Sequence, residues 1–332
     1  MNNKPFKKGI SYFGVRNPKL AKYDFEIIAQ AGFTHILQTY SEADLQYYPE
    51  TMAELIDLSA QYGLKSYINP WGVGRVFGGE AYSELTGRNP EMAQKGPQDE
   101  HFVAACPNHP GFRAYMQKWI ETVCQTQVET IFWDEPHFYF EKQNPEIWAC
   151  TCATCQKLFR EQYGFNMPRE LSSEFLAFRE NSLIDFLRWA TDLVKTMGKR
   201  NSVCMLPPWF PAGLDNWELV AEIPSVDELS SDPYWEKHTP RSEIAPTYNH
   251  TAQKLVGLAE KFQKDAQIWI KNYHIVAGTE DFIDIATQTS INKGIRNIFA
   301  WSYMGSEYMS WLKSDNPSLV WQTQIQALKK LN

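Results

Sequence analysis

Two adjacent acidic residues, Asp134 and Glu135, stand at the end of an apolar run in the segment FWDEPH (residues 132–137). Carboxyl groups beside a buried strand are costly unless they are paired, solvated or catalytic, and Pro136 ends the strand behind them. Because side chains alternate along a strand, we expect the two acids to point in different directions, one into a site and the other towards a neighbour. A solvated pair of acids in a loop is the alternative interpretation.

A second acidic position lies at the end of a later strand-like run, where Asp232 occurs in SSDPYW (residues 230–235). Hydrolysis of a glycosidic bond needs two carboxyl groups on either side of it, one of them protonated as the general acid. We therefore predict Asp134, Glu135 and Asp232 as the catalytic carboxyl groups. Asp227 and Glu228 lie earlier in that run and are explained equally well by a salt bridge.

Aromatic and polar side chains crowd the segments that follow the apolar runs. Sugar rings present apolar C–H faces and a rim of hydroxyl groups, so exposed rings beside carboxylates suit a carbohydrate. For any single ring, closing the top of the fold is an equally good interpretation. The candidate substrate-binding residues are Tyr12, Tyr40, Trp71, Arg75, Glu80, Trp133, His137, Trp209, Tyr234, Trp235, Tyr273, His274, Trp301 and Tyr303.

The glycine-rich segment WGVGRVFGGE (residues 71–80) carries two of these candidates, Arg75 and Glu80. It lacks the Lys-Ser/Thr ending of a phosphate-binding P-loop. We expect it to form a flexible cover over the site.

Three of the six cysteines form the cluster CTCATC (residues 150–155). Thiols this close together, in a chain without a recognisable secretion signal, favour a metal site over disulfides. Zinc prefers four ligands in a tetrahedron, and Cys106 is the first choice for the fourth, with His109 as the alternative. A thiol-redox role and a cluster without metal are the competing interpretations. The expected ligands of a structural zinc are Cys106, Cys150, Cys152 and Cys155.

Eight strand-like runs alternate with amphipathic helical segments along the chain, a pattern that predicts parallel strands joined by right-handed crossovers. The runs are Gly9–Gly14, Thr34–Thr39, Leu64–Asn69, Thr130–Asp134, Ser202–Leu206, Val226–Ser230, Gln267–Asn272 and Asn297–Trp301. The fold expected from them is a single (β/α)8 TIM barrel over residues 1–332, with long loops after strands three and four. Residues 136–170 are expected to be a loop insertion that carries the cysteine cluster.

Composition limits the classes of partner. The net charge is −7, and no basic run marks a surface for nucleic acid or for an anionic membrane. No apolar stretch reaches the roughly 18 residues of a membrane span. The lysines near the start precede no apolar run, so we expect no signal peptide and a cytoplasmic location. A homo-oligomer is compatible with the sequence.

The stretch from Cys106 to Gly164 resembles the metal-cluster β-galactosidases of glycoside hydrolase family 42. The likeness lies in CPNHPGFR (residues 106–113), the acidic end of strand four, and the cysteine cluster followed by Phe159-Arg160 and Tyr163-Gly164. It implies a (β/α)8 barrel, a retaining mechanism with Glu135 as acid/base, and a zinc ion bound by the four cysteines named above.

The sequence departs from that family at strand seven, which ends in NYH (residues 272–274) without the glutamate nucleophile. An Asp ending strand four and another ending strand six instead resemble the α-galactosidase and α-glucosidase clans, which would make Asp134 the nucleophile and Asp232 the acid/base. We therefore expect a glycosidase with an altered linkage or substrate. The alternative is a non-catalytic carbohydrate-binding barrel that has lost its nucleophile.

Overall fold

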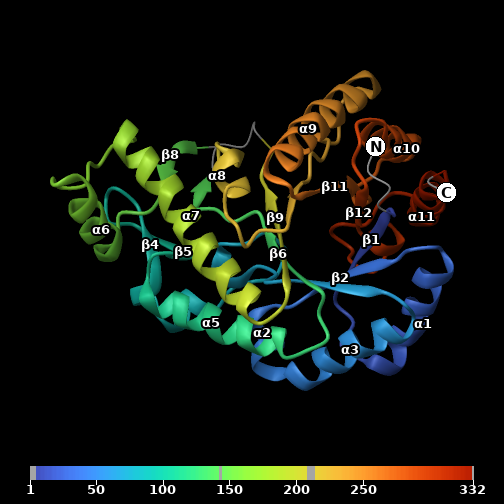
Figure 1. Cartoon of the computed structure of the whole chain (residues 1–332), viewed down its shortest axis with the longest axis horizontal. Coiled ribbons are helices and arrows are strands. Elements are labelled where there is room, and N and C mark those ends of the chain that lie inside the picture. Colours follow the sequence, from blue (N-terminus) through green and yellow to red (C-terminus); the bar gives the residue numbers. More distant parts are fainter. Residues whose placement is uncertain (1–4, 142–143, 208–213, 331–332) are drawn as a thin grey trace.

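A closed barrel of eight parallel strands forms the centre of the molecule (Figure 1). The computed structural model describes residues 5–141, 144–207 and 214–330. The barrel strands are β1 (Lys7–Tyr12), β2 (His35–Thr39), β3 (Lys65–Asn69), β6 (Thr130–Asp134), β9 (Arg200–Met205), β10 (Glu228–Ser231), β11 (Asp265–Lys271) and β12 (Asn297–Trp301). Each pairs in parallel with its neighbours, and β12 closes the ring onto β1. The predicted (β/α)8 barrel is confirmed, with every expected strand present.

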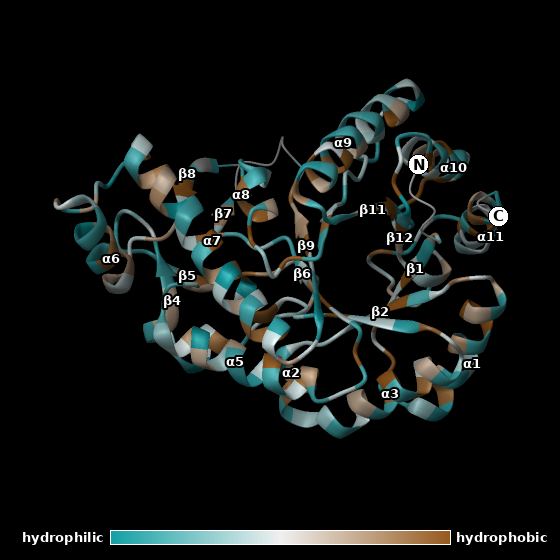
Figure 2. Ribbon diagram, in the orientation of Figure 1, coloured by the Kyte–Doolittle hydropathy of each residue, from teal (hydrophilic) through white to brown (hydrophobic). Residues whose placement is uncertain are grey.

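Helices surround the barrel. The long ones are α1 (Pro18–Gln30), α3 (Pro49–Gln61), α5 (Pro110–Cys124), α7 (Ser173–Thr196), α9 (Arg241–Phe262), α10 (Asp281–Asn292) and α11 (Pro317–Lys329). The shorter ones are α2 (Glu42–Tyr47), α4 (Leu85–Arg88), α6 (Ala153–Tyr163) and α8 (Trp217–Ala221). Figure 2 shows both hydrophilic and hydrophobic residues on each long helix, as expected for helices that cover a sheet on one side and meet water on the other.

Strand residues alternate between two separate apolar layers. Leu37, Phe132 and Trp269 belong to a cluster made only of strand residues and of aromatic residues at the strand ends, which fills the barrel interior. Residues one position away, such as Ile131 and Ile268, join the helices in the outer core. Gly9 lies where the ring of Phe299 fills the interior, and a Cβ atom there would come within 2.3 Å of that ring.

An ion pair occupies the amino-terminal end of the barrel. The Glu228 carboxylate lies 3.3 Å from Lys7 Nζ and accepts hydrogen bonds from Tyr67, Gln267 and Asn297. Glu228 is 1% exposed. Of the two interpretations open for this residue, the salt bridge is the one observed.

Two extensions occur after the third and fourth barrel strands. The first contains α4 and the hairpin of β4 (Ala93–Lys95) with β5 (His101–Ala105), together with 3-10 turns at Val73–Arg75 and Pro90–Met92. The second contains α6 and the pair β7 (Phe140–Glu141) and β8 (Asn144–Trp148). In the described part of the chain, no helix is both long and apolar enough to cross a membrane.

Candidate active site

A small pocket opens at the carboxyl ends of the barrel strands, with a cavity of about 140 Å³. Its walls consist of acidic and aromatic side chains with one glycine and one cysteine. The lining residues are Gly79, Glu80, Phe132, Asp134, Glu135, Cys204, Asp232, Tyr234, Trp269, Tyr273 and Trp301. The three predicted catalytic carboxyl groups therefore share one pocket, on the face where barrel enzymes place their chemistry.

The backbone explains how two adjacent acids reach the same pocket. Asp134 continues the inward-facing row of Phe132 at the end of β6. Glu135 follows with a φ of +44°, a left-handed conformation that turns its side chain back into the barrel mouth. The expectation that Asp134 and Glu135 point in different directions is thus wrong, because the strand alternation ends before Glu135.

The Glu135 and Asp232 carboxyl groups are neighbours in the pocket, close enough for charge and hydrogen bonding between them to shift both pKa values. Burial, then the charge of Asp232 and this hydrogen bond, hold the pKa of Glu135 well above its ordinary value. Burial also raises the pKa of Asp232 to about 7, although the hydrogen bond with Glu135 partly opposes the rise. Two carboxyl groups this close cannot both ionise easily, so Glu135 holds the proton and Asp232 accepts from it.

The other two acids of the pocket have their own hydrogen-bond partners. Asn69 Nδ2 donates to Asp134 Oδ2 at 3.3 Å, and Trp71 Nε1 donates to Glu80 Oε2 at 3.1 Å. Burial, followed by the charges of Glu135 and Glu80, holds the pKa of Asp134 well above its usual range. Loss of hydration at the pocket mouth raises the pKa of Glu80, although the residue as a whole is exposed.

Glycines bring the cover segment close to these acids. The Gly78 amide donates to the Asp134 carbonyl at 2.9 Å, and a Cβ atom on Gly78 would lie 3.0 Å from Glu135 Oε2. Gly79 has a φ of +115°, and a Cβ atom there would overlap the Trp71 ring at 1.8 Å. Larger residues at either position would push the cover away from the carboxyl groups.

Three of the predicted aromatic residues line the pocket: Tyr234, Tyr273 and Trp301. Tyr234 and Tyr273 meet edge to face with their ring centroids 5.4 Å apart. Trp301 stacks on Phe13, which in turn contacts Trp71. Together these rings form an apolar wall beside the acids.

Five other predicted rings lie in the layer between the barrel and the helices and do not line the pocket. Tyr12 and Tyr303 contact each other and donate to Asp24 of α1. The remaining three pack against residues of the outer layer: Tyr40 against Trp119, Trp133 near Trp119 with a hydrogen bond to Asn201, and Trp235 against Tyr248 and Phe282. Strand alternation explains Trp133, which lies one position from the inward-facing Phe132 and Asp134.

The remaining candidates lie around the pocket. His137 Nδ1 is 2.6 Å from the Glu135 carbonyl, and its amide donates to Val76 of the cover segment. Arg75 is exposed on that segment. His274 hydrogen-bonds to the Trp311 carbonyl, and its charge acts on Glu80. The predicted residue Trp209 lies outside the described residues.

Besides Gly79 of the cover segment, sequence reasoning missed three lining residues: Phe132, Cys204 and Trp269. Each lies on the inward-facing row of its strand and belongs to the interior cluster. Counting back two residues from Asp134 would have identified Phe132. Cys204 Sγ lies 3.7 Å from Asp232 Oδ1, so it is a neighbour of the acids as well as a core residue.

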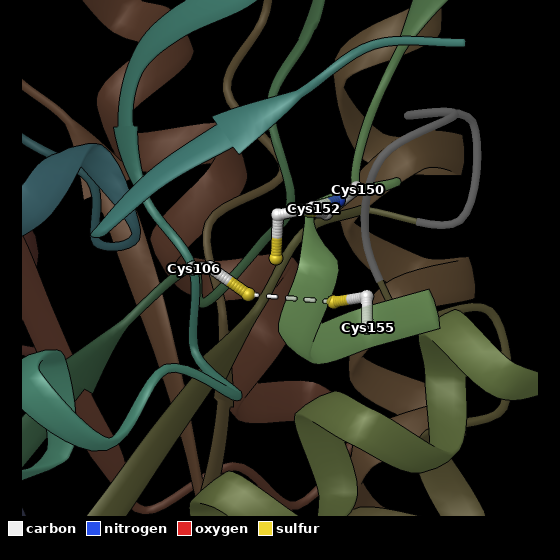
Figure 3. A group of neighbouring side chains, drawn as sticks. All are labelled: Cys106, Cys150, Cys152 and Cys155. Carbon is white, nitrogen blue, oxygen red and sulfur yellow. Dashed lines mark hydrogen bonds between the residues drawn. The ribbon is translucent and has the colours of Figure 1, made fainter. Parts of the chain in front are cut away.

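The four cysteines expected to bind a metal converge between the two extensions (Figure 3). Their sulfur atoms all lie within 4.8 Å of one another, all four side chains are buried, and none forms a disulfide. Cys106 follows β5, Cys150 and Cys152 follow β8, and Cys155 lies in the first turn of α6. Four buried thiols at this separation match the tetrahedral ligand set that a structural metal ion needs.

Nearby donors support this cluster as a metal-binding group. Asn108 Nδ2 donates to Cys155 Sγ at 3.3 Å, and the Cys152 amide donates to Cys150 Sγ at 3.4 Å, contacts of the kind that stabilise metal-bound thiolates. The alternative ligand, His109, instead accepts from the Gly111 amide at the start of α5. Cys106 is therefore the fourth member of the described group.

The sequence matches no protein-family model, and no curated protein is significantly similar to it. Solved structures do resemble the fold. An endo-1,4-beta-mannanase from Rhizomucor miehei aligns with a TM-score of 0.64 at 11% identity, over 99% of this chain and 97% of its own. GH5_18 from Streptomyces cattleya, solved with GlcNAc, aligns with a TM-score of 0.62 at 11% identity, over 99% of this chain and 80% of its own.

The barrel is also shared with enzymes of other classes. A D-allulose 3-epimerase from Methylomonas sp. aligns with a TM-score of 0.52 at 11% identity, over 99% of both chains. At such low identity these likenesses establish the TIM-barrel fold alone, and the chemistry has to be argued from the pocket.

Proposed function

We propose that this protein is a retaining glycoside hydrolase that acts on a small carbohydrate. The observation that supports the proposal is that the Glu135 and Asp232 carboxyl groups lie together in a pocket walled by aromatic rings. A glycosidase needs one carboxylic acid and one carboxylate beside the bond it cleaves. The pair can provide both, because Asp232 raises the pKa of Glu135 whereas the hydrogen-bonding effect of Glu135 lowers that of Asp232.

Each member of the pair has a defined role in this proposal. Glu135 gives its proton to the leaving oxygen while the Asp232 carboxylate attacks the anomeric carbon and forms a glycosyl ester. Glu135 then takes a proton from water, which hydrolyses the ester and returns both groups to their starting state. Neighbouring carboxyl groups that shift each other's pKa suit the roughly 5–5.5 Å carboxyl separation of retaining enzymes better than the 6.5–9.5 Å of inverting ones, which must leave room for a water.

The size of the pocket favours a single sugar residue. Its cavity of about 140 Å³ is smaller than the roughly 300–1,000 Å³ of clefts that hold drug-sized ligands. The rings of Trp269 and Trp301 supply apolar surface for the sugar face, and carboxyl groups accept hydrogen bonds from its hydroxyls.

A panel of nitrophenyl glycosides and natural disaccharides tests the proposal, with the anomer of the first product followed by NMR. Hydrolysis with retention, abolished in Glu135→Gln, is the expected result. Sugar binding without any product would favour the non-catalytic barrel instead. Product of inverted configuration would keep the hydrolase and reject Asp232 as the nucleophile.

We further propose zinc as the ion of the cysteine group, because an all-thiolate tetrahedron suits zinc and leaves no open position for substrate. Its role would be to join the two extensions. Kinship with glycoside hydrolase family 42 and a cytoplasmic location both stay predictions.

A further inference from the structure

The pocket holds more carboxyl groups than the proposed reaction uses. Four acids line it, and the retaining mechanism assigns only Glu135 and Asp232. Asp134 and Glu80 are left over, although keeping acids beside other acids in a partly buried pocket is unfavourable. A role in binding would explain why they are there.

The charges around these two acids are not balanced by the pocket walls. Among the described residues, no Lys, Arg or His side chain lines the pocket, and His274, which acts on Glu80, lies outside the lining. Lys271, the last residue of β11, donates to the Trp235 carbonyl at 2.7 Å, and its ammonium lies over the Tyr273 ring, 5.0 Å from the ring centroid. The missing positive charge must therefore come from protons or from a ligand.

Hydrogen-bond acceptors also outnumber donors beside Asp134. Asn69 Oδ1 is fully buried and has no hydrogen-bond partner in the described part of the chain, while its Nδ2 is already used by Asp134. An ammonium group offers three donors and one positive charge, and so satisfies carboxylates and amide oxygens together.

The remaining walls are aromatic. Phe132, Trp269 and Trp301, with Tyr234 and Tyr273, place five rings around the same cavity. Ring faces attract cations, most strongly those of Trp. Carboxylates and rings without a basic residue therefore select a cationic ligand over a neutral one and repel an anionic sugar.

We infer that the sugar taken by this pocket carries a free, protonated amino group, bound by Asp134 and Glu80. The inference rests on the proposed glycosidase function for the chemistry, but its binding part stands independently of catalysis. It excludes N-acetylated sugars and uronic acids as preferred ligands, since neither presents a cation.

Titration calorimetry tests the binding part, with 2-amino and 6-amino hexoses of the gluco, galacto and manno series as probes. Each is compared with its parent sugar, and the 2-amino sugars also with their N-acetyl forms. We expect at least one amino sugar to bind ten-fold or more tightly than its parent, with the preference shrinking as salt is added. Glu80→Gln and Asp134→Asn should each reduce the ratio, whereas Glu91→Gln, an exposed acid outside the pocket, should keep it. Equal or weaker binding of every amino sugar would overturn the inference.

Kinetics separate this inference from the proposed function. Nitrophenyl glycosides of the same sugars should show a kcat/KM at least ten-fold higher for the free amine than for the parent. Preferred cleavage of neutral sugars would contradict the inferred amino-sugar preference and leave the proposed hydrolase function standing. Amino-sugar binding without cleavage of any glycoside would contradict the proposed hydrolase function and leave the amino-sugar preference standing.

Discussion

The carboxyl groups of Glu135 and Asp232 meet in one pocket at the barrel mouth, although they directly follow β6 and β10 and are almost a hundred positions apart in the sequence. β9 lies between these two strands in the barrel and contributes Cys204 beside Asp232. The ends of three consecutive barrel strands thus form one side of the pocket. Several properties of the protein should depend on this pair.

Glu135→Gln should lower kcat/KM by roughly 10²–10⁴ for glycosides with a poor leaving group, because the general acid is lost. Nitrophenyl glycosides, whose leaving group needs less protonation, should suffer less. Steady-state kinetics on both substrate types check this, with the surface variant Glu54→Gln as a control. An equal loss on both types would show that Glu135 does not act as the acid.

Activity should depend on pH through the same pair. Since the pKa of Asp232 is raised to about 7, kcat/KM should increase as the pH rises through this value and Asp232 ionises. It should fall again at higher pH, where Glu135 loses its proton. A pH profile of kcat/KM measures both limbs, and full activity at pH 5 would contradict the assignment of Asp232.

Asp232→Asn should make the protein more resistant to unfolding at neutral pH while removing activity. A carboxyl group whose pKa is higher in the folded than in the unfolded state favours folding while it is protonated. This stabilisation is lost as the pH rises from about 4 to about 7, because the folded protein must then bury an ionised group. The gain at pH 8 should be at most about 4 kcal/mol, since one pKa unit corresponds to about 1.4 kcal/mol. Urea unfolding at pH 4 and pH 8 tests the prediction, and an equal effect at both values would reject it.

Removal of the metal should affect stability more than chemistry. Elemental analysis should give one ion per chain, and chelation or Cys152→Ser should lower Tm by more than about 5 °C, since metal binding contributes to folding free energy. Cys124→Ala, which changes a buried cysteine of α5 outside the group, is the matched control. A chelated protein with unchanged Tm would show that the four thiols need no ion.

Glu228→Ala should destabilise the closed barrel by about 3–5 kcal/mol, because it leaves Lys7 without its buried partner and the interior donors unsatisfied. Lys65→Ala removes the ion pair with Glu129, in which Lys65 is 64% exposed, and should cost less than about 1 kcal/mol. Denaturant unfolding of both variants gives the comparison. Similar losses would mean that the Glu228 network adds little beyond a surface pair.

The alternation of apolar runs was enough to predict the eight strands, since in a barrel each strand is covered on both faces and reads as an apolar segment. The hairpin of β4 and β5 was missed, because its stability comes from contacts with residues far along the chain. One such contact is the hydrogen bond from the Thr151 amide to the Lys95 carbonyl at 2.8 Å. The local sequence pattern of β4 and β5 does not indicate that pairing.

The sequence was enough to predict which strand ends carry the acidic residues of the site, but not which way each side chain points. Asp134 and Asp232 were placed correctly at the ends of their strands, and the structure brings them together. The orientation of Glu135 depends on a left-handed backbone conformation that a glutamate at this position does not predict. Whether a predicted ring lines the pocket depends on whether its strand position faces into or out of the barrel, as the contrast between Trp133 and Phe132 shows.

The cysteine group has a consequence for anyone who rebuilds this protein. One sulfur comes from the extension after β3, which also delivers Gly78 and Glu80, and three come from the extension after β6, which begins at Glu135. The two loops are therefore not separate modules. Grafting either one alone onto another scaffold would leave an incomplete ligand set, so a successful transplant has to move both together.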